Sequence, residues 1–525
     1  MPRLSLVAPL SSAAEPRLRE TVASLNGQTC PEWELVRADL ASGEPIEAVN
    51  AALRKASGEF FALLDPGDTI APTAVSRVLE AVDAAPDVDH LYTDEDEIDA
   101  LGRTSNPFYK PAWSPDRLRC QPYTGRLGLL RRSLVEEVGG LRAGFEGAEE
   151  HDLVLRVTER ARRIVHVPEV LYHRHIPSAT HPSGSAIPPR ASEAGRRAIA
   201  EHLARVGFPA TVEIDGDRRY RLRPDLHDEP LVSVVIPTAG RWRMVYGSPM
   251  NLVVKCVESI LERSTYSNYE IVCVIDDEAA DHTRDSLKRA AGARLRFVRY
   301  DGDFNFARAI NLGVARSRGS HLLLLNDDTQ VITPDWIQSM LMFARDDGVG
   351  AVGAKLLFAD DRIQHAGIIA IGRGGPGHPY YGFPGNYDGY ADNLRVPSDY
   401  LAVTGACLLT KRDCFNAVGG FATMFPLNYN DVDYCLKLRH RGYRVVFSPG
   451  AVLHHFELST RVSGEVASEE LDLLNDRWGS VLERDPFYNP NFLPSCDFMP
   501  PIRTAVEARR SDIAPWPRAG ALPLP

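Results

Sequence analysis

Apolar segments of strand length alternate with amphipathic helical segments along most of the chain. The first series opens with an apolar strand at residues 4–8, a helix around 18–25 and a strand at 33–36. A second series opens with the strand Val232–Thr238, then a helix at 252–263 and a strand at 270–275. Such alternation is typical of a mainly parallel sheet with helices on both faces. The pattern therefore predicts an α/β fold.

One pattern occurs twice, and its two copies differ at a chemically important point. Residues 48–68 read AVNAALRKASGEFFALLDPGD, and residues 309–329 read AINLGVARSRGSHLLLLNDDT. Small residues, an asparagine, a glycine and an apolar strand recur in the same register. The second copy ends its strand on Asn326-Asp327-Asp328, whereas the first ends on Asp65-Pro66-Gly67. A carboxylate that could hold a metal therefore remains only in the second copy.

The repeat and the length of 525 residues predict two domains rather than one core. We expect a first domain at residues 1–176, a linker with a short helix and strands at 177–229, a second domain at 230–499, and a disordered tail at 500–525. The connection at residues 39–48 of the first copy is much shorter than its counterpart at 276–309. The first domain therefore lacks a helix and a strand that the second is expected to have.

Charge and terminal sequence exclude some classes of protein. The formal net charge of -11 argues against a nucleic-acid binder, because phosphate neutralisation needs a basic surface. The first ten residues, MPRLSLVAPL, are interrupted by Pro9 and are too short for a signal peptide or a membrane span. We expect a cytoplasmic protein, with a peripheral position at the inner face of the membrane left open.

Polar residues end three strands of the second domain. Ligands of such sheets bind beyond the carboxyl ends of the strands, where Thr238, Asp276 and Asp328 are expected to meet. A single aspartate after a strand is most often a turn former, but three such positions indicate a site. Asp276 could accept hydrogen bonds from a nucleobase or ribose, or cap the next helix. Asp328 offers the oxygen ligand that Mg²⁺ or Mn²⁺ prefers.

Two further residues carry alternative interpretations. Asp431 begins a helix predicted at 431–441, where it could cap the helix or act as a general base toward an acceptor hydroxyl. His455 follows an apolar strand and could be a structural anchor or a metal ligand. The first copy has His173 at the matching place, since Val170-Leu171-Tyr172-His173 aligns with Val452-Leu453-His454-His455.

Taken together, these segments resemble glycosyltransferase family 2, the inverting enzymes with the GT-A fold, and in particular two-domain members associated with O-antigen and capsule assembly. The segments that carry the resemblance are Val232–Thr238, 270–277, 304–329, 402–409, 418–421, 430–441, 455–461, Arg477-Trp478-Gly479 and 485–491. The first domain is similar to the same family through Tyr92-Thr93-Asp94-Glu95-Asp96 and residues 108–116. The resemblance extends to about residue 495.

The resemblance implies two tandem GT-A (Rossmann-like) domains and a nucleoside-diphosphate sugar as donor. It implies a glycan or lipid-linked glycan as acceptor, Mg²⁺ or Mn²⁺ as cofactor, and no nucleic-acid partner. The residues expected to contact the donor are Thr238, Asp276, Asn311, Asn326 and Asp327. Asp328 and His455 are expected to hold the metal, and Asp431 to be the catalytic base. In the first domain Gly67 replaces the metal carboxylate and Glu150 stands at the position of the base. That domain therefore resembles a transferase that has lost its activity.

Two other functions fit parts of the pattern. A nucleotidyltransferase that makes sugar nucleotides shares a related sheet and metal carboxylates, although Pro237-Thr238-Ala239-Gly240-Arg241 lacks its Gly-rich, basic first loop. A glycan-binding scaffold would require both copies to have lost catalysis. Release of pyrophosphate would indicate the first alternative, and absence of metal-dependent nucleotide binding the second.

Overall fold

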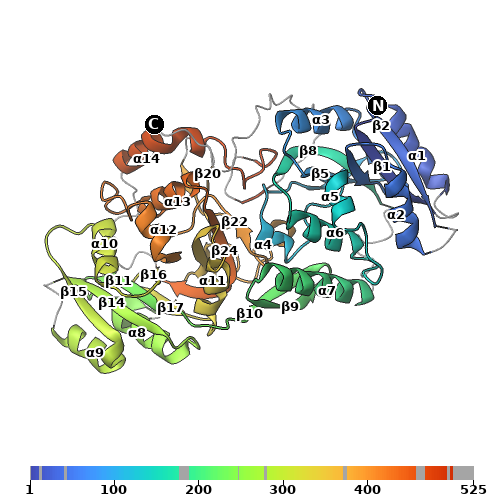
Figure 1. Cartoon of the computed structure of the whole chain (residues 1–525). Helices are drawn as coiled ribbons and strands as arrows, with labels where there is room; N and C mark the ends of the chain where they lie inside the picture. Colours follow the sequence, from blue (N-terminus) through green and yellow to red (C-terminus); the bar gives the residue numbers. More distant parts are fainter. Residues whose placement is uncertain are drawn as a thin grey trace.

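Two mixed sheets, one in each half of the chain, organise the structure, which is a computed structural model. It describes residues 2–10, 15–40, 44–176, 189–245, 247–276, 281–370, 375–456, 468–493 and 497–499. The predicted tail and residues 177–188 of the predicted linker lie outside these ranges. The half with the first sheet and the half with the second lie side by side (Figure 1).

The first sheet has eight strands in the order β2-β1-β3-β7-β5-β8-β4, with β6 paired to β5. Its strands are β1 (Leu4–Leu10), β2 (Trp33–Asp39), β3 (Phe60–Leu63), β4 (Thr69–Ile70), β5 (His90–Ile98), β6 (Thr104–Phe108), β7 (Leu129–Arg131) and β8 (Ile164–His175). The helices of this half are α1 (Glu15–Asn26), α2 (Pro45–Lys55), α3 (Ala74–Ala84), α4 (Pro115–Leu118), α5 (Arg132–Glu137) and α6 (Glu149–Thr158).

The second sheet has ten strands, eight of them in the order β15-β14-β11-β16-β23-β18-β24-β17. These are β11 (Val232–Thr238), β14 (Tyr269–Asp276), β15 (Leu295–Tyr300), β16 (His321–Leu325), β17 (Thr329–Val331), β18 (Val349–Leu357), β23 (Cys407–Lys411) and β24 (Arg444–His455), joined by the short β19 (Ile363–His365) and β22 (Ser398–Asp399). The helices are α8 (Leu252–Arg263), α9 (Asp281–Ala291), α10 (Phe306–Arg316), α11 (Trp336–Ala344), α12 (Arg412–Ala417), α13 (Asn430–His440) and α14 (Ser468–Leu482). Two small pairs stand apart from this sheet, β12 (Trp242–Val245) with β13 (Ser248–Asn251), and β20 (Ile369–Ala370) with β21 (Pro376–Gly377).

The two sheets share one strand order, and the second has an extra edge strand. β2-β1-β3-β7-β5-β8-β4 corresponds to β14-β11-β16-β23-β18-β24-β17, while β15 has no counterpart. α9 and β15 fill the longer connection of the second copy, as its length indicates. The strands from β15 to β16 are parallel, but β23 is antiparallel to both of its neighbours. The alternation of elements predicted the parallel part and gave no signal for the antiparallel strand.

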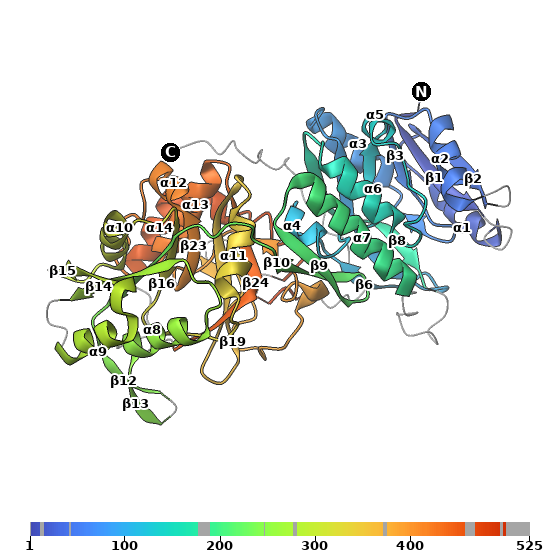
Figure 2. The same cartoon turned by 60° about the horizontal axis from the view of Figure 1, so that its bottom comes forward.

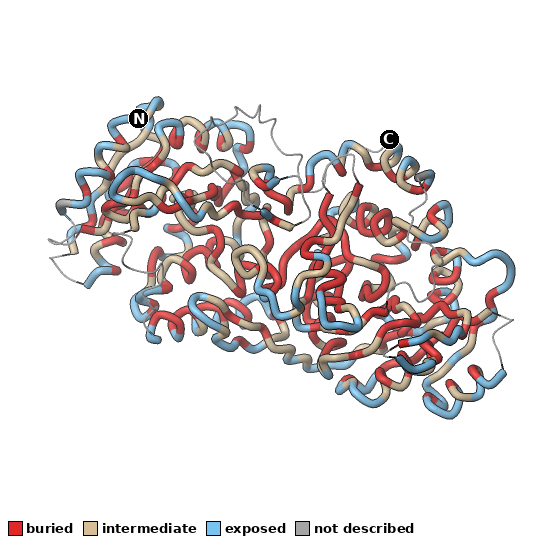
Figure 3. The backbone as a smooth tube through the Cα atoms, turned by 180° about the vertical axis from the view of Figure 1, so that it is seen from behind, coloured by how far each residue is buried: buried red, intermediate tan, exposed pale blue. Residues whose placement is uncertain are grey.

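Alternate residues of each central strand face opposite layers of helices. In β11, Val234 and Ile236 belong to the apolar cluster that contains buried residues of α8, whereas Val235 belongs to the one that contains those of α10. Because both faces are covered, β11 is buried along its whole length, which explains its uninterrupted apolar sequence. Buried residues lie in the interior of both halves, and exposed residues lie mainly at the periphery (Figure 3).

Between the two sheets the chain forms α7 (Pro189–Val206) and the hairpin of β9 (Ala210–Gly216) and β10 (Arg219–Pro224). Two views place this hairpin between the halves (Figures 1 and 2). Phe208, just before the hairpin, packs on Phe343 of α11 with ring centroids 6.0 Å apart. In the described part of the chain, no helix is both long and apolar enough to cross a membrane.

Candidate functional site

Three parallel strands end together at one edge of the second sheet. β11 lies between β14 and β16, and its last residue, Thr238, pairs with Ile275, the residue before Asp276. β16 ends at Leu325, so Asn326 and the two following aspartates form the next turn. The predicted site residues Thr238, Asp276 and Asp328 are therefore brought to the same edge.

A hydrogen bond connects the ends of β11 and β16. The hydroxyl of Thr238 donates to Asp327 Oδ2 at 2.5 Å and accepts from the Gly240 backbone N–H at 2.9 Å. Asp327 is only 9% exposed. Its burial and the neighbouring Asp328 carboxylate raise the pKa of Asp327 above the ordinary value for aspartate. Negative charge is therefore concentrated here at an energetic cost that a bound cation would offset.

The chain places His455 beside Asp328 through strand pairing. β17 follows Asp328 directly and pairs antiparallel with β24, with Thr329 opposite His455. His455 Nε2 lies 3.2 Å from Asp328 Oδ1 and also 3.2 Å from the amide nitrogen of Asn326. Asn326 Oδ1 is buried and has no hydrogen-bond partner among the described residues. Carboxylate, imidazole and amide groups therefore converge on one point.

Asp431 reaches the same region from α13. The Gly405 backbone N–H donates to Asp431 Oδ2 at 2.8 Å, and the carbonyl of the next residue, Ala406, accepts from the Asn326 N–H at 3.0 Å. The Val432 N–H donates to Asp431 Oδ1 at 2.8 Å. A Cβ at Gly405 would lie 3.3 Å from Asp431 Cβ, so glycine allows this close approach. The carboxylate of Asp431 is thus fixed next to the turn that carries Asp327 and Asp328.

The start of α13 follows a residue with unusual backbone geometry and is bound by side chains of α14. Tyr429, which precedes the helix, has a φ of 57°, a left-handed conformation that a bulky residue rarely adopts. The fully buried Asp433 accepts from Trp478 Nε1 at 2.9 Å and pairs with Arg477 Nε at 2.9 Å. The Arg477-Trp478-Gly479 segment therefore positions the helix that presents Asp431.

The side chain of Asn311, which we expected to contact the sugar donor, instead binds the protein backbone. Its amide Nδ2 donates to the Phe421 carbonyl at 2.8 Å, and its Oδ1 accepts from the Phe421 N–H at 2.9 Å. In the first half, Asn50 makes the same pair of bonds to Leu141, each at 2.9 Å. Both asparagines therefore hold a loop to a helix, which explains why they recur in the repeat. These contacts do not support a donor-binding role for Asn311.

The described residues contain no set of three or more His, Cys, Asp or Glu side chains arranged to hold a metal ion. The expected metal role of Asp328 and His455 therefore remains a prediction that rests on their close pairing. Asp276 ends β14, and its backbone carbonyl accepts from Arg284 at 2.8 Å, whereas residues 277–280 lie outside the described ranges.

Sequence reasoning did not identify a histidine pair beside this site. Buried His365 accepts at Nε2 from the Thr404 N–H at 3.4 Å and the Gly367 N–H at 3.3 Å. Its Nδ1 lies 2.9 Å from His378 Nδ1. Burial holds the pKa of His365 well below its usual value, so the ring is neutral. His365 thereby supports the loop that binds Asp431, and its position in short β19 gives no periodic signal.

An arginine fills the corresponding site of the first half. Arg126, at the position of Ala406, makes hydrogen bonds of 3.0 Å and 3.1 Å to the Asp65 carboxylate. Its guanidinium also donates to Glu150, the residue at the position of Asp431. The side chain of Asp68 binds the Tyr172 hydroxyl at 2.5 Å. The guanidinium of Arg126 therefore lies between Asp65, the counterpart of Asn326, and Glu150, the counterpart of Asp431.

The expected match between His173 and His455 is wrong by one position. Thr69 pairs with His173, whereas Gln330, the counterpart of Thr69 in the repeat, pairs with His454. His173 therefore corresponds to His454, and Arg174 stands at the position of His455. Arg174 pairs with Glu97 at 2.5 Å. The first half thus lacks a histidine at this position as well as the metal carboxylate.

Comparisons with known proteins give similarities over most of the chain. The chain is 36% identical to the uncharacterised protein y4gI of Sinorhizobium fredii over 531 residues, covering 93% of this chain and 57% of that protein. It is 34% identical to the O-antigen biosynthesis protein RfbC of Myxococcus xanthus over 520 residues, covering 93% of this chain and 40% of that protein. The chain thus spans about half the length of the curated relatives it matches.

Among solved structures, the mannosyltransferase PcManGT from Pyrobaculum calidifontis, in complex with GDP-Man and Mn²⁺, is similar with a TM-score of 0.33 and 18% identity. That similarity covers 45% of this chain and 59% of the other. Residues 233–381 match the sequence model of glycosyl transferase family 2, a range that includes Thr238, Asp276 and the turn at 326–328. The part of the chain that contains these residues therefore matches glycosyl transferase family 2.

Proposed function

We propose that the chain is an inverting glycosyltransferase that moves a sugar from a nucleoside-diphosphate donor to a hydroxyl of a glycan or lipid-linked glycan. The observation that carries the proposal is the convergence of Asp327, Asp328, His455 and Asp431 at the carboxyl edge of the parallel strands. Ligands of α/β sheets bind at this edge. The family match of residues 233–381 supports the same reaction class.

The side chains at the turn suit a divalent cation. Asp328 Oδ1 and His455 Nε2, 3.2 Å apart, would each supply one ligand, and the partnerless Oδ1 of Asn326 would point toward the same ion directly or through water. Mg²⁺ and Mn²⁺ often bind through one or two protein ligands, with substrate phosphates completing the shell. A bound ion would supply Lewis-acid stabilisation of the departing diphosphate.

Asp431 would act as the base. Its two carboxylate oxygens each accept one backbone N–H, so their remaining lone pairs stay available to an acceptor hydroxyl. As the acceptor oxygen bonds to the anomeric carbon, the bond from that carbon to the diphosphate breaks and the hydroxyl proton passes to Asp431. One displacement of this kind inverts the anomeric configuration. General-base catalysis of this type contributes about 10²- to 10⁴-fold in rate.

The biological setting is also part of the proposal. The similarity to a protein named for O-antigen biosynthesis supports a role in cell-surface polysaccharide synthesis, with the reaction at the cytoplasmic side and the protein peripheral to the inner face of the membrane. In the first half, Arg126 supports the interpretation of a domain that no longer catalyses transfer and braces the second half instead.

A screen of UDP-, dTDP- and GDP-sugars with Mn²⁺ or Mg²⁺ tests the proposal. One donor should be hydrolysed to the nucleoside diphosphate slowly without acceptor, and chelation of the metal should abolish the reaction. The Asp328→Asn variant should lose metal-dependent nucleotide binding while its circular dichroism spectrum stays unchanged. Pyrophosphate release from a nucleoside triphosphate and a sugar phosphate would instead indicate a nucleotidyltransferase. Absence of any metal-dependent nucleotide affinity would indicate a scaffold.

A further inference from the structure

A cavity of about 680 Å³ lies on the other face of β24 from His455. Its walls come from β10, α11, the loop at 384–397, and the strands β18 and β24. Lys355 of β18 pairs with Val452 of β24, and both line the cavity. His455 lies three residues beyond Val452, on the opposite face of the strand. The cavity is therefore separate from the proposed catalytic site.

The first half has a counterpart of this cavity, and the chain's own C-terminal segment fills it. β5 and β8 correspond to β18 and β24, and both strand pairs have a register shift at the same point, just before Asp94 in β5 and just before Lys355 in β18. Pro168 of β8 corresponds to Pro449 of β24, which lines the cavity. Asp94 and Lys355 thus hold equivalent positions in the two halves.

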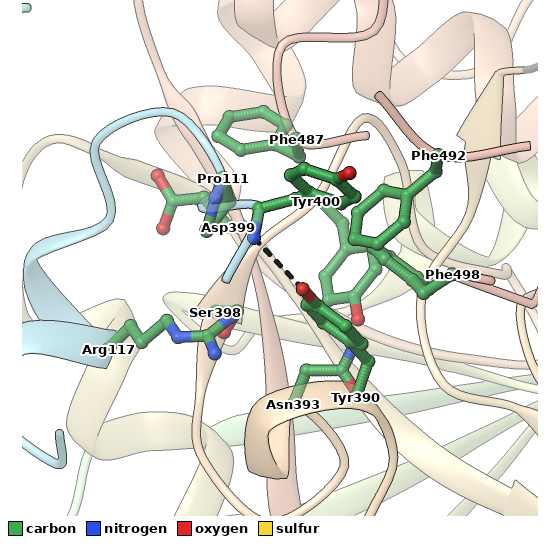
Figure 4. Close-up of a pocket in the computed structure, with 11 residues that line it drawn as sticks. Pro111, Arg117, Tyr390, Asn393, Ser398, Asp399, Tyr400, Phe487, Phe492 and Phe498 are labelled. Atoms are coloured by element: carbon green, nitrogen blue, oxygen red, sulfur yellow. Dashed lines mark hydrogen bonds between the residues drawn. The ribbon is translucent and has the colours of Figure 1, made fainter. Parts of the chain in front are cut away.

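The segment in the first half binds by its asparagine side chains. Asn489 Nδ2 donates to Asp94 Oδ2 at 2.8 Å and to the Lys110 carbonyl at 2.9 Å. Asn491 Nδ2 donates to the Pro168 carbonyl at 2.9 Å. Phe487 and Phe492, from the same stretch of chain, line a small cavity together with Pro111 of the first half (Figure 4). Here a carboxylate at the base of the groove selects amide donors.

In the second half the charge at the base of the cavity is reversed. Lys355 is 7% exposed, and its ammonium donates to the Gly385 carbonyl at 2.7 Å. No ion pair joins Lys355 to a carboxylate within the described ranges, so two of its three donor positions have no acidic partner. Burial lowers the pKa of Lys355 to about 8, which reflects the cost of an ammonium left without an anion.

Carboxylates balance the arginines on the rim of the cavity. The cavity is lined by Arg221, Arg223, Arg362 and Arg395, which pair with Asp215, Glu213, Asp360 and Asp388. Asp361 lies 2.7 Å from His454. Among the described residues that line the cavity, Lys355 is therefore the cation that lacks a carboxylate partner. From the filled counterpart and the reversed charge, we infer that this cavity is a docking site for an extended peptide segment of a partner protein that places a carboxylate against Lys355.

Two synthetic peptides test the inference. One has the sequence of residues 485–491, DPFYNPN, and the other differs only by aspartate in place of Asn489; both are blocked at their ends. Calorimetric titration of the full chain, without nucleotide sugar, should show binding of the aspartate peptide and binding about tenfold weaker for the asparagine peptide. Because no donor is present, the result is independent of whether the chain transfers sugar.

Variants of the chain identify the site. Lys355→Met should lower the affinity for the aspartate peptide about tenfold. Lys55→Met, at an exposed lysine of α2, should leave this affinity unchanged. Lys355→Asp recreates the charge of the first-half groove and should reverse the preference toward the asparagine peptide. Melting curves check that each variant is folded, and Arg362→Met at the exposed rim replaces Lys355→Asp if that variant does not fold, with a weaker loss expected.

Three outcomes would overturn the inference. The first is that neither peptide binds up to millimolar concentration. The second is binding that Lys355→Met leaves unchanged. The third is Lys355-dependent binding of an acidic tetrasaccharide such as tetragalacturonate, tighter than that of the aspartate peptide, which would assign the cavity to a glycan instead.

Discussion

At the scale of single residues, one substitution between the two copies changes the charge beside the turn and the helix start. Ala406 brings no charge there, whereas Arg126 at the equivalent position contacts both Asp65 and Glu150. Burial raises the pKa of Glu150, although the charge of Arg126 opposes that shift. The guanidinium therefore provides in the first half the positive charge that a metal would provide in the second.

Removing this guanidinium should destabilise the first half without creating a second active site. We expect Arg126→Ala to lower the free energy of unfolding by about 1–3 kcal/mol, because Glu150 loses its partner in a partly buried place. Urea unfolding followed by circular dichroism measures the change. Arg54→Ala, which removes only an exposed pair with Glu47, is the control and should cost less than about 1 kcal/mol. Equal stability of the two variants would contradict this role of Arg126.

At the residue scale, sequence alone predicted Asp328, Asp431 and His455 because each follows a buried strand or opens a helix. It could not predict Arg126, since an arginine after Gly125 gives no signal until the fold places it opposite Glu150. His365 was missed for the same reason, because its partners Thr404 and Gly367 depend on long-range packing.

At the scale of elements, the repeat preserves the contacts that join helices to loops. α2 and α10 each present an asparagine whose amide binds one backbone residue in both directions, Leu141 for Asn50 and Phe421 for Asn311. The repeat therefore includes residues that stabilise the fold as well as candidate catalytic residues. An asparagine that makes the same backbone contacts in both copies is explained by its structural role.

This distinction can be measured at α10. We expect Asn311→Ala to reduce the free energy of unfolding by about 1–3 kcal/mol, since it leaves the Phe421 N–H and carbonyl without partners. Its KM for the donor should stay within about twofold of the unaltered enzyme. Asn50→Ala, the matched change in the first half, should cost a similar amount. A rise in KM with unchanged stability would restore the donor-binding role of Asn311.

Element boundaries followed from the sequence wherever one periodicity ran without interruption. The segments expected at 232–238 and 252–263 coincide with β11 and α8. The apolar strand expected before His455 is longer in the structure, because β24 continues through a register shift to His455 itself. That irregularity also displaced the alignment of His173, since apolar pattern does not reveal a shift of one residue.

At the scale of the whole molecule, buried charges join the two halves. Arg444 of β24 contacts Asp116 of the first half at 2.7 Å and Asp399 of the second at 2.9 Å. Burial raises the pKa of Asp399 to about 6, although Arg444 opposes this shift. The hydroxyl of Ser114 donates to Asp399 at 3.3 Å, and the Asp399 N–H donates back to it at 3.0 Å. Each buried charge at this interface therefore depends on the others for its hydrogen bonds and its ion pairs.

Breaking this network should uncouple the halves. We expect Arg444→Met to lower the free energy of unfolding by about 3–5 kcal/mol, because Asp116 and Asp399 would remain buried without their cation. Urea denaturation should change from one transition to two. Arg441→Met, at an exposed position close by, should leave a single transition. A single, unshifted transition in both variants would show that the contact does not couple the halves.

The repeat in the sequence predicts two similar halves but not how they contact each other. The segment at 485–491 and the acidic motif around Asp94 could both be noted as distinctive, yet they are far apart in the chain. The structure shows that they contact one another, since Asn489 and Asn491 bind Asp94 and its neighbours. Such a pairing depends on the placement of the domains, which local periodicity does not encode.

We expect sugar transfer to occur in the second half alone. The most direct measurement compares the turnover of Asp431→Asn with that of Glu150→Gln, using the donor found in the screen. We expect Asp431→Asn to lose at least about 10²-fold in kcat while still binding the nucleoside diphosphate with metal, and Glu150→Gln to keep its kcat. Undiminished transfer by Asp431→Asn, or its loss in a folded Glu150→Gln variant, would contradict the account.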